Sequence, residues 1–409
     1  MTIENGRVTM QVTGIQHGEC NFMSKLMKYD IMQNRRVLFG PGMVKEIGSI
    51  LNEKNSKRLF ILTYSSQTDV LDGILATIRQ EKIDAYVCDI VQDEPDLMVI
   101  DQLAQLMKDN KSDAVLALGG GSVMDAAKAA AMIATNGGTS EEYQMQGKAI
   151  TCPSLPLIMV PTTAGTGSEA TKTSVICNTH SNLKKSIYSP YMIAHTVILD
   201  PDVTLGLPAN VTAFTGIDAL SHAIESYVSL NKNDYTQMYG LKAVELIGKS
   251  LATAVADGSN TSARADMLYA SYFAGCALNA GIGLAHMIAQ PVGGLFKVPH
   301  GEACSIFLPY SMEYNMDSSA NEYCSIGRAL GLELKGDSPE NAKLTIDKVR
   351  KLISEVNTAT SLKPYVAKLD EAGLEDTVQT ILQATGHIKC NPRPVDGAAI
   401  KDVLIKTLA

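Results

Sequence analysis

Five short runs of apolar residues punctuate the first half of this chain, and helix-like stretches lie between them. The runs occupy residues 59–63, 85–88, 114–118, 157–160 and 197–199, and the clearest are apolar at nearly every position. Such runs are typical of parallel strands covered on both faces. Helical periodicity at residues 70–81 and 97–108 supplies the covering elements. Strands that alternate with helices predict an α/β domain with a mostly parallel, Rossmann-like sheet.

The pattern changes after Pro208, where strand signals nearly vanish. Helical periodicity runs through residues 210–227, 235–256, 262–284 and 342–357. With 409 residues the chain has room for two domains. We therefore expect an α/β domain over residues 1–205, in which residues 1–28 form an extension, and an all-α domain over residues 206–409.

Composition excludes several classes of function. The chain has 35 Lys and Arg against 43 Asp and Glu, a net charge of −8 that argues against nucleic acid as the main partner. It has eight cysteines without a CxxC pair, which indicates a reducing compartment and favours small buried side chains for all eight. The first 20 residues do not resemble a signal peptide, so we expect a cytoplasmic protein.

One uncharged stretch, residues 267–296, is long enough to cross a bilayer. It contains Asn279, His286, Gln290 and Pro291, which as a group are unfavourable in lipid. We interpret it as one or two helices buried in a protein core and expect no membrane partner.

Two glycine-bearing loops follow predicted strands. The first, GGGSVMDAAK at residues 119–128, leads directly into a helix, and the second is PTTAGTGSE at residues 161–169. A glycine turn at a helix start lets a phosphate approach free N–H groups. Either loop alone could be an ordinary turn. Because both leave the carboxyl ends of strands, we expect them to converge into a dinucleotide cradle.

Four potential metal ligands occur in the helical half. Asp218 and His222 are four residues apart and so share a helix face, while His286 and His300 lie in or beside very apolar sequence. Each could be a core residue or half of a surface pair. Together, one carboxylate and three imidazoles are a plausible site for Fe²⁺ or Zn²⁺ with a position open to substrate.

The chain resembles the iron-containing (group III, metal-dependent) alcohol dehydrogenase family from about Tyr29 to the end. The similarity rests on FGPG at residues 39–42, both glycine loops, GIDALSHAIES at 216–226, the block from His286 to His300, and NPR at 391–393. It implies a dehydroquinate synthase-like architecture, assembly into a homo-oligomer (a dimer or higher), and catalysis in a cleft between two domains. It also implies metal binding by Asp218, His222, His286 and His300, and cofactor binding by Gly120, Gly121, Ser122, Asp125, Thr162, Thr163, Thr166, Ser168 and Lys185.

Three departures from the family pattern bear on substrate and cofactor. Gln290 stands where many relatives carry a second histidine, and it can hydrogen-bond a substrate but cannot titrate. No acid follows the first strand, in Tyr64-Ser65-Ser66, so the cofactor is NAD or NADP. His387, close to Lys389, suits a small aldehyde with an anionic head such as a sulfonate, phosphonate or carboxylate, although a solvated loop is the alternative.

The expected reaction is the metal-dependent, NAD(P)H-linked reduction of a small aldehyde to the alcohol, or its reverse. One alternative is a dehydroquinate synthase-like lyase that uses NAD transiently, although the blocks around Asp218 and His286 lack the Lys and Arg expected there. Another is a non-catalytic relative that binds dinucleotide or metal. Glycerol-type dehydrogenases and metal-free reductases are nearer rivals.

Overall fold

The computed structural model describes residues 2–4, 7–9, 30–64, 68–92, 94–178, 183–366, 369–383 and 389–408. Its contacts divide the chain into two compact units, Met1–Met32 and Gln33–Ala409. In the first unit, β1 (Thr2–Glu4) pairs antiparallel with β2 (Arg7–Thr9). Much of the predicted extension, residues 10–28, lies outside the described residues. The second unit contains every other element described below.

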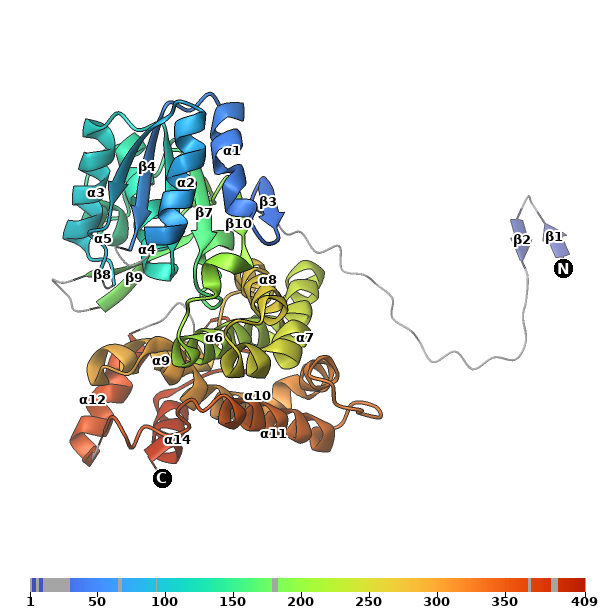
Figure 1. Ribbon diagram of the computed structural model, residues 1–409. Coiled ribbons are helices and arrows are strands. Elements are labelled where there is room, and N and C mark those ends of the chain that lie inside the picture. Colours follow the sequence, from blue (N-terminus) through green and yellow to red (C-terminus); the bar gives the residue numbers. More distant parts are fainter. Residues whose placement is uncertain are drawn as a thin grey trace. The chain divides into compact units, whose positions relative to one another are not determined.

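A six-stranded sheet, parallel throughout, organises the first part of the second unit, as predicted (Figure 1). Its strand order is β3-β10-β7-β6-β4-β5. The strands are β3 (Arg36–Phe39), β4 (Arg58–Thr63), β5 (Asp84–Cys88), β6 (Ala114–Gly119), β7 (Leu157–Pro161) and β10 (Thr196–Leu199).

Helices cover both faces of this sheet. Leu116 of β6 packs in one apolar cluster with α1 (Ile47–Glu53) and α2 (Thr68–Gln80). Its neighbours Val115 and Ala117 pack in the other cluster, with α3 (Leu97–Asp109) and α4 (Gly121–Asn136). Burial on both sides explains why β6 is apolar along its length. The predicted α/β class is therefore confirmed.

The structure adds strands that periodicity missed. β3 is an edge strand whose residues are mostly exposed, so it has no continuous apolar run. β8 (Thr173–Asn178) and β9 (Leu183–Tyr188) form an antiparallel hairpin in which lysines and serines interrupt the apolar residues. Short elements connect the sheet: α5 (Ser140–Met145) and the 3₁₀ turns η1 (Met43–Glu46), η2 (Ser168–Ala170), η3 (Pro190–Met192) and η4 (Pro201–Thr204).

From residue 209 onward the described elements are all helical, as predicted. They are α6 (Ala209–Val228), α7 (Asp234–Ala256), α8 (Thr261–Ala277), η5 (Leu278–Ala280), α9 (Leu284–Phe296), α10 (His300–Ala329), α11 (Pro339–Glu355), α12 (Glu371–Leu382) and α14 (Gly397–Leu408). One apolar cluster runs through both the α/β and the helical parts. The domain boundary at residue 205 stays a prediction, because Gln33–Ala409 forms a single compact unit.

The helix predicted over residues 262–284 is wrong in its extent. α8 ends at Ala277, and the side chain of Asn279 donates to the carbonyl oxygen of Cys276 at 3.0 Å, which satisfies a group at the helix end. Most of α8 and α9 is buried, as expected for the uncharged stretch. Within the described residues no single helix has both the length and the apolar character needed to cross a membrane. The segment α8–η5 and helix α9 have that length and apolar character only when taken together, and they are bent by 106° relative to each other.

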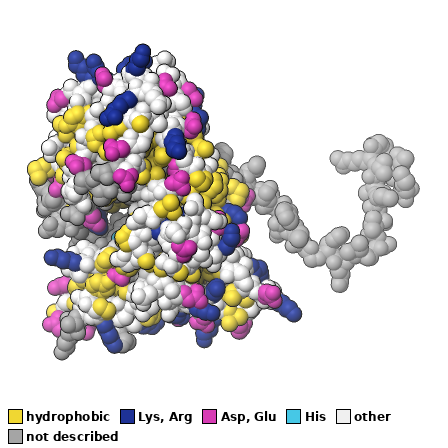
Figure 2. All heavy atoms as spheres, viewed as in Figure 1, with side chains coloured by type: hydrophobic (Ala, Val, Ile, Leu, Met, Phe, Trp, Pro, Cys, Tyr) yellow, Lys and Arg dark blue, Asp and Glu magenta, His cyan; other side chains and the backbone are white. Residues whose placement is uncertain are grey.

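Charge is mixed on the face of the molecule shown in Figure 2. Lys and Arg side chains are interspersed there with Asp and Glu and with hydrophobic patches. This distribution agrees with the small net negative charge of the sequence.

Candidate active site

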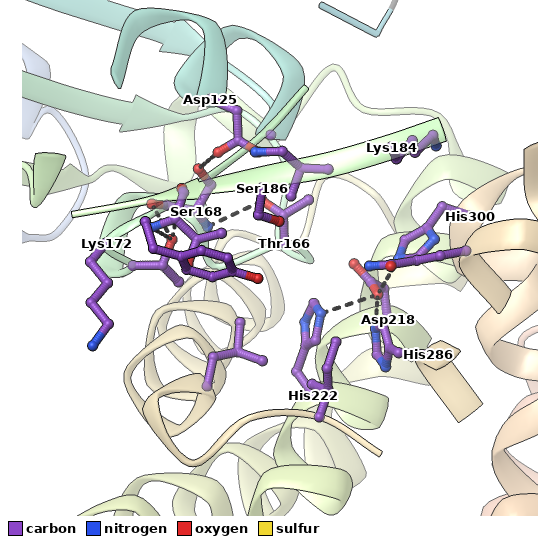
Figure 3. Close-up of a pocket in the computed structure, with 18 of the residues that line it drawn as sticks. Asp125, Thr166, Ser168, Lys172, Lys184, Ser186, Asp218, His222, His286 and His300 are labelled. Atoms are coloured by element: carbon purple, nitrogen blue, oxygen red, sulfur yellow. Dashed lines mark hydrogen bonds and ion pairs between the residues drawn. The ribbon is translucent and has the colours of Figure 1, made fainter. Parts of the chain in front are cut away.

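A cavity of about 530 Å³ lies between the carboxyl edge of the sheet and the helical part. Its walls come from the start of α4, the loop after β7, the hairpin β8–β9, and helices α6, α9 and α10. Figure 3 shows Asp125, Thr166 and Ser168 toward one end of this cavity and Asp218 with its histidines toward the other. The cavity therefore joins the two sets of residues that the sequence singles out.

Sheet register brings the two glycine loops together. Gly119 at the end of β6 pairs with Pro161 at the end of β7, and the backbone N–H of Thr162 donates to the carbonyl oxygen of Gly119 at 3.1 Å. A Cβ atom added to Gly121 would lie 2.7 Å from Cγ2 of Thr166. Only a residue without a side chain lets the loops pack this closely.

The first end of the cavity has the features of a phosphate site. α4 begins at Gly121, no side chain caps its start, and Gly121 and Ser122 line the cavity. The hydroxyl oxygen of Thr163 is buried without a hydrogen-bond partner among the described residues. Uncapped N–H groups at the positive end of a helix attract anions. The residues present thus fit the pyrophosphate of a dinucleotide.

Asp125 ties these loops to the hairpin. Its carboxylate accepts hydrogen bonds from the hydroxyl of Ser168 and, at 3.0 Å, from the backbone N–H of Val175. It also forms an ion pair at 2.9 Å with Lys128, a wholly buried side chain that donates to the carbonyl oxygen of Ser168. Asp125 thereby fixes the shape of the cradle.

The predicted cofactor residues fall into three groups. Gly121, Ser122, Asp125, Thr166 and Ser168 line the cavity. Gly120, Thr162 and Thr163 belong to the same two loops but are not among the lining residues. Lys185 is not brought to the cavity: β9 turns Lys184, Ser186 and Tyr188 toward it, and side chains alternate along a strand. The lysine of β9 that the structure places there is Lys184, which forms an ion pair with Glu94.

At the other end of the cavity, three imidazoles surround one carboxylate oxygen. Oδ1 of Asp218 lies 3.3 Å from Nε2 of His286, 3.5 Å from Nε2 of His300 and 3.6 Å from Nε2 of His222. Figure 3 shows the three rings turned toward Asp218. Asp218 and His222 come from α6, His286 from α9 and His300 from the first residue of α10. The structure thus brings all four predicted ligands together.

Two of the three imidazole rings, those of His286 and His222, are oriented by a hydrogen bond from Nδ1, the nitrogen that points away from Asp218. Nδ1 of His286 donates to Oε2 of Glu225, and Nδ1 of His222 donates to the carbonyl oxygen of Gly165 at 3.3 Å. Glu225 is itself held by the backbone N–H of Ala285 at 2.7 Å. Partners of this kind fix the ring orientation and the tautomer of metal-ligating histidines, leaving Nε2 free to bind. The donor set therefore fits Fe²⁺ or Zn²⁺.

Electrostatics agree with a cation site. Burial lowers the pKa of His222 to about 4, so this ring is neutral at pH 7. Burial alone would also lower the pKa of His300, but the neighbouring Cys304 and Asp218 raise it to about 10. Burial opposes ionisation of Asp218, yet His222 and His300 hold the pKa of that carboxyl well below its ordinary value. A metal ion needs unprotonated ligands, so its binding would displace the proton held on His300.

Sequence reasoning missed Glu225 and Cys304. Glu225 follows Asp218 by seven residues and His222 by three, so all three share one face of α6. Cys304 follows His300 by four residues on α10, and its sulfur lies 3.6 Å from Oδ1 of Asp218. The helical spacing was the available signal in both cases.

The two predicted substrate-side residues have different outcomes. Gln290, on α9, lines the cavity with Asp218 and the histidines. His387 lies outside the described residues. Ser65 and Ser66, on which the choice between NAD and NADP was argued, also lie outside them, while Tyr64 is described.

Comparisons with known proteins give a consistent result. The family described as iron-containing alcohol dehydrogenase matches residues 34–201, and the C-terminal family of Fe-containing alcohol dehydrogenases matches residues 212–408. Long-chain-alcohol dehydrogenase 1 of Geobacillus thermodenitrificans is 32% identical over 384 residues, which are 91% of this chain and 96% of that protein.

Solved structures agree. A 1,3-propanediol oxidoreductase superposes with a TM-score of 0.89 at 29% identity, covering 93% of this chain and 100% of the other. A sulfoacetaldehyde reductase from Bifidobacterium kashiwanohense, in complex with NAD⁺, superposes with a TM-score of 0.86 at 29% identity, covering 94% and 99%. The alternatives of a lyase or a non-catalytic protein are not retained. The chain belongs to the iron-containing alcohol dehydrogenase family, whose members are oxidoreductases that use NAD(H) and a divalent metal.

Proposed function

We propose that this protein reduces a small aldehyde to the corresponding alcohol, or runs the reverse oxidation, in the cavity between the sheet and the helices. The observation that carries this proposal is that one cavity has a potential metal site at one end and a potential phosphate site at the other. A carboxylate and three imidazoles converge at one end, and an uncapped helix start lies at the other.

The proposed roles follow from this layout. Asp218, His222, His286 and His300 hold the cation, and Gly121, Ser122, Thr166 and Ser168 hold the cofactor's phosphates. Glu225 orients His286, and Asp125 keeps the glycine loops in register with the hairpin. When bound, the cation supplies Lewis acidity for the substrate oxygen and the dinucleotide supplies or accepts hydride. The chain's own contribution is to fix both at one cavity and to limit access of water.

Gln290 is proposed to position the substrate. It lines the cavity on the same helix as His286, one turn further along. Its amide can donate a hydrogen bond to a substrate oxygen or accept one from a substrate hydroxyl, but it does not gain or lose a proton at neutral pH. Proton exchange with the substrate therefore depends on another group or on water. Because the proposed role of Gln290 is to position the substrate, a Gln290→Ala variant is expected to raise KM more than it lowers kcat.

We also propose that the substrate carries an anionic head group. Lys172 and Lys184 contribute to the cavity lining, and a sulfoacetaldehyde reductase is among the similar structures. The proposal that His387 also contacts the head group rests on the sequence alone. The cofactor is proposed to be NAD or NADP, because no acid that would repel a 2′-phosphate follows β4 in Tyr64-Ser65-Ser66.

The test is an aldehyde panel assayed with NADH and with NADPH on anaerobically prepared Fe²⁺ and Zn²⁺ forms. Net oxidation of the reduced cofactor with an aldehyde supports the reaction class. A higher kcat/KM for sulfoacetaldehyde or phosphonoacetaldehyde than for acetaldehyde supports the anionic head group. Equal values for the three would remove that part of the proposal and leave the reaction class intact.

A further inference from the structure

We propose that the sulfur of Cys304 is a fifth ligand of the metal centre, in addition to Asp218, His222, His286 and His300. This inference rests on the metal centre proposed above and adds to it a soft, anionic ligand. The side chain is wholly buried, and it does not line the cavity that the other four residues share. It approaches the cluster from the protein side.

Distances within the cluster match the edges of a coordination sphere. The sulfur of Cys304 lies 3.6 Å from Oδ1 of Asp218, 3.6 Å from Nε2 of His286 and 3.7 Å from Nε2 of His300. Neighbouring ligands held about 2.0–2.3 Å from one zinc ion, in four- or five-coordinate geometry, are roughly 2.8–3.8 Å apart. The ligand atoms of Asp218, His286, His300 and Cys304 all lie within 4.8 Å of one another, which makes Cys304 part of the tightest cluster among the described residues. His222 is outside that group and reaches the cluster through Asp218, with Nε2 3.6 Å from Oδ1.

Helix packing makes this arrangement possible. His300 and Cys304 are four residues apart at the start of α10, so both face the same direction. A Cβ atom added to Gly301 would lie 2.2 Å from the carbonyl oxygen of Phe214, which is one turn before Asp218 on α6. The glycine therefore lets the start of α10 rest against α6, and this contact brings the thiol within reach of the carboxylate.

Coordination by sulfur has a chemical consequence. As the sulfur binds, the thiol releases its proton to solvent and a sulfur–metal bond replaces the S–H bond. One carboxylate and one thiolate then balance the two charges of the cation. Thiolate ligands favour Zn²⁺ over harder cations, so the chain is expected to retain Zn²⁺ in competition with Fe²⁺. The cavity side of the cluster stays available to substrate.

The test replaces the native metal with Co²⁺ and records the absorption spectrum of the whole chain. Cobalt bound to a thiolate gives a charge-transfer band in the near ultraviolet, while its visible bands report that the ion is bound at all. We expect the charge-transfer band in the wild type and in two control variants, and its loss in Cys304→Ser with the visible bands retained. The controls are Cys324→Ala, a second buried cysteine on α10, and Cys390→Ala, a cysteine that lines the cavity.

X-ray absorption on the zinc-loaded wild type provides a readout that does not depend on any variant. A sulfur neighbour at about 2.3 Å is expected. A bound metal with only nitrogen and oxygen neighbours would overturn the role of Cys304 while leaving the metal centre standing. Failure of the wild type to bind Co²⁺ or Zn²⁺ would instead contradict the metal centre itself, and with it this inference. A charge-transfer band that persists in Cys304→Ser and disappears in Cys390→Ala would also overturn it.

Discussion

Glu225 illustrates how much of this site depends on a residue behind the ligands. Its carboxylate accepts the Nδ1 proton of His286 and the backbone N–H of Ala285, so it fixes both the ring and the start of α9. Glu225→Gln is expected to weaken metal binding by roughly 10- to 100-fold, because a neutral amide orients and polarises the ring less well. Competition with a chelator of known affinity measures the change.

The matched control is Glu169→Gln, which makes the same substitution at another wholly buried acidic side chain. Neither carboxylate oxygen of Glu169 has a hydrogen-bond partner among the described residues. The side chain therefore holds none of the three imidazoles in place. Metal affinity should be unchanged in this variant. An equal loss of metal affinity in the two variants would mean that any buried acidic side chain supports the site. The role given to Glu225 would then be wrong.

Glu169 itself makes a prediction about stability and pH. Burial raises the pKa of its carboxyl from the ordinary 4.5 to about 7. Between these two values the folded state keeps a proton that the unfolded state gives up, so the free energy of unfolding falls as pH rises through this window. The total loss is about 3 kcal/mol, at 1.36 kcal/mol per unit of pKa difference.

Glutamine does not titrate, so the free energy of unfolding of Glu169→Gln should rise relative to that of the wild type between pH 5 and pH 7. Above pH 7 the difference between the two proteins should stay constant. Urea unfolding of both proteins at several pH values measures this difference. Stability curves that stay parallel across the window would contradict the burial argument.

At this scale the sequence could predict which side chains come together better than how they are held in place. The i, i+4 spacing places Asp218 and His222 on one face of α6, as observed. The same reasoning could have added Glu225 and Cys304, but a helical carboxylate is commonly solvated and a lone cysteine is commonly a small core residue. What made the difference was the packing of α9 and α10 on α6, which periodicity does not reveal.

Among the elements, the turn from β6 into α4 bears most directly on cofactor binding. Gly121→Ala would place a Cβ atom 2.7 Å from Thr166 and force the two glycine loops apart. We expect kcat/KM for NADH to fall on the order of 10- to 100-fold, because small displacements of a positioned reactant are costly. Metal content should be unchanged, since the ligands lie on other elements.

Gly73→Ala on α2 is the control for this substitution. An added Cβ there meets nothing within 4 Å, so the variant should keep wild-type kinetics and gain up to about 1 kcal/mol from better helix propensity. Steady-state kinetics with varied NADH test both variants. Normal kinetics in Gly121→Ala would show that the cradle does not depend on the close approach of the loops.

Elements with strong periodicity could be predicted, and those shaped by their neighbours could not. The buried strands β4, β6 and β7 appear as continuous apolar runs because both faces of the sheet are covered. The edge strand β3 and the hairpin β8–β9 lack such runs, and the break between α8 and α9 is invisible in an apolar stretch without charges. The cofactor role of Lys185 stays a prediction. The structure places Lys184 rather than Lys185 at the cavity, because the register of a hairpin decides which of two adjacent lysines faces it.

For the molecule as a whole, the central claim is that one cavity couples a cation site in the helical part to a dinucleotide site on the sheet. The composition of the chain argues against a polyanionic macromolecule as its main partner, but only the fold brings α6, α9 and α10 against the loops after β6 and β7. The measurement that tests this claim most directly compares bound metal and aldehyde-dependent NADH oxidation in the wild type and in His286→Ala.

His195→Ala serves as the matched control, since His195 contacts Lys54 and Thr196 and none of the proposed ligands. The account predicts that the wild type and His195→Ala contain about one divalent metal ion per chain and turn over. His286→Ala should lose the metal and, on the order of 100-fold or more, its turnover, because a Lewis acid contributes several kcal/mol. Full NADH oxidation by a metal-free His286→Ala protein would contradict the account.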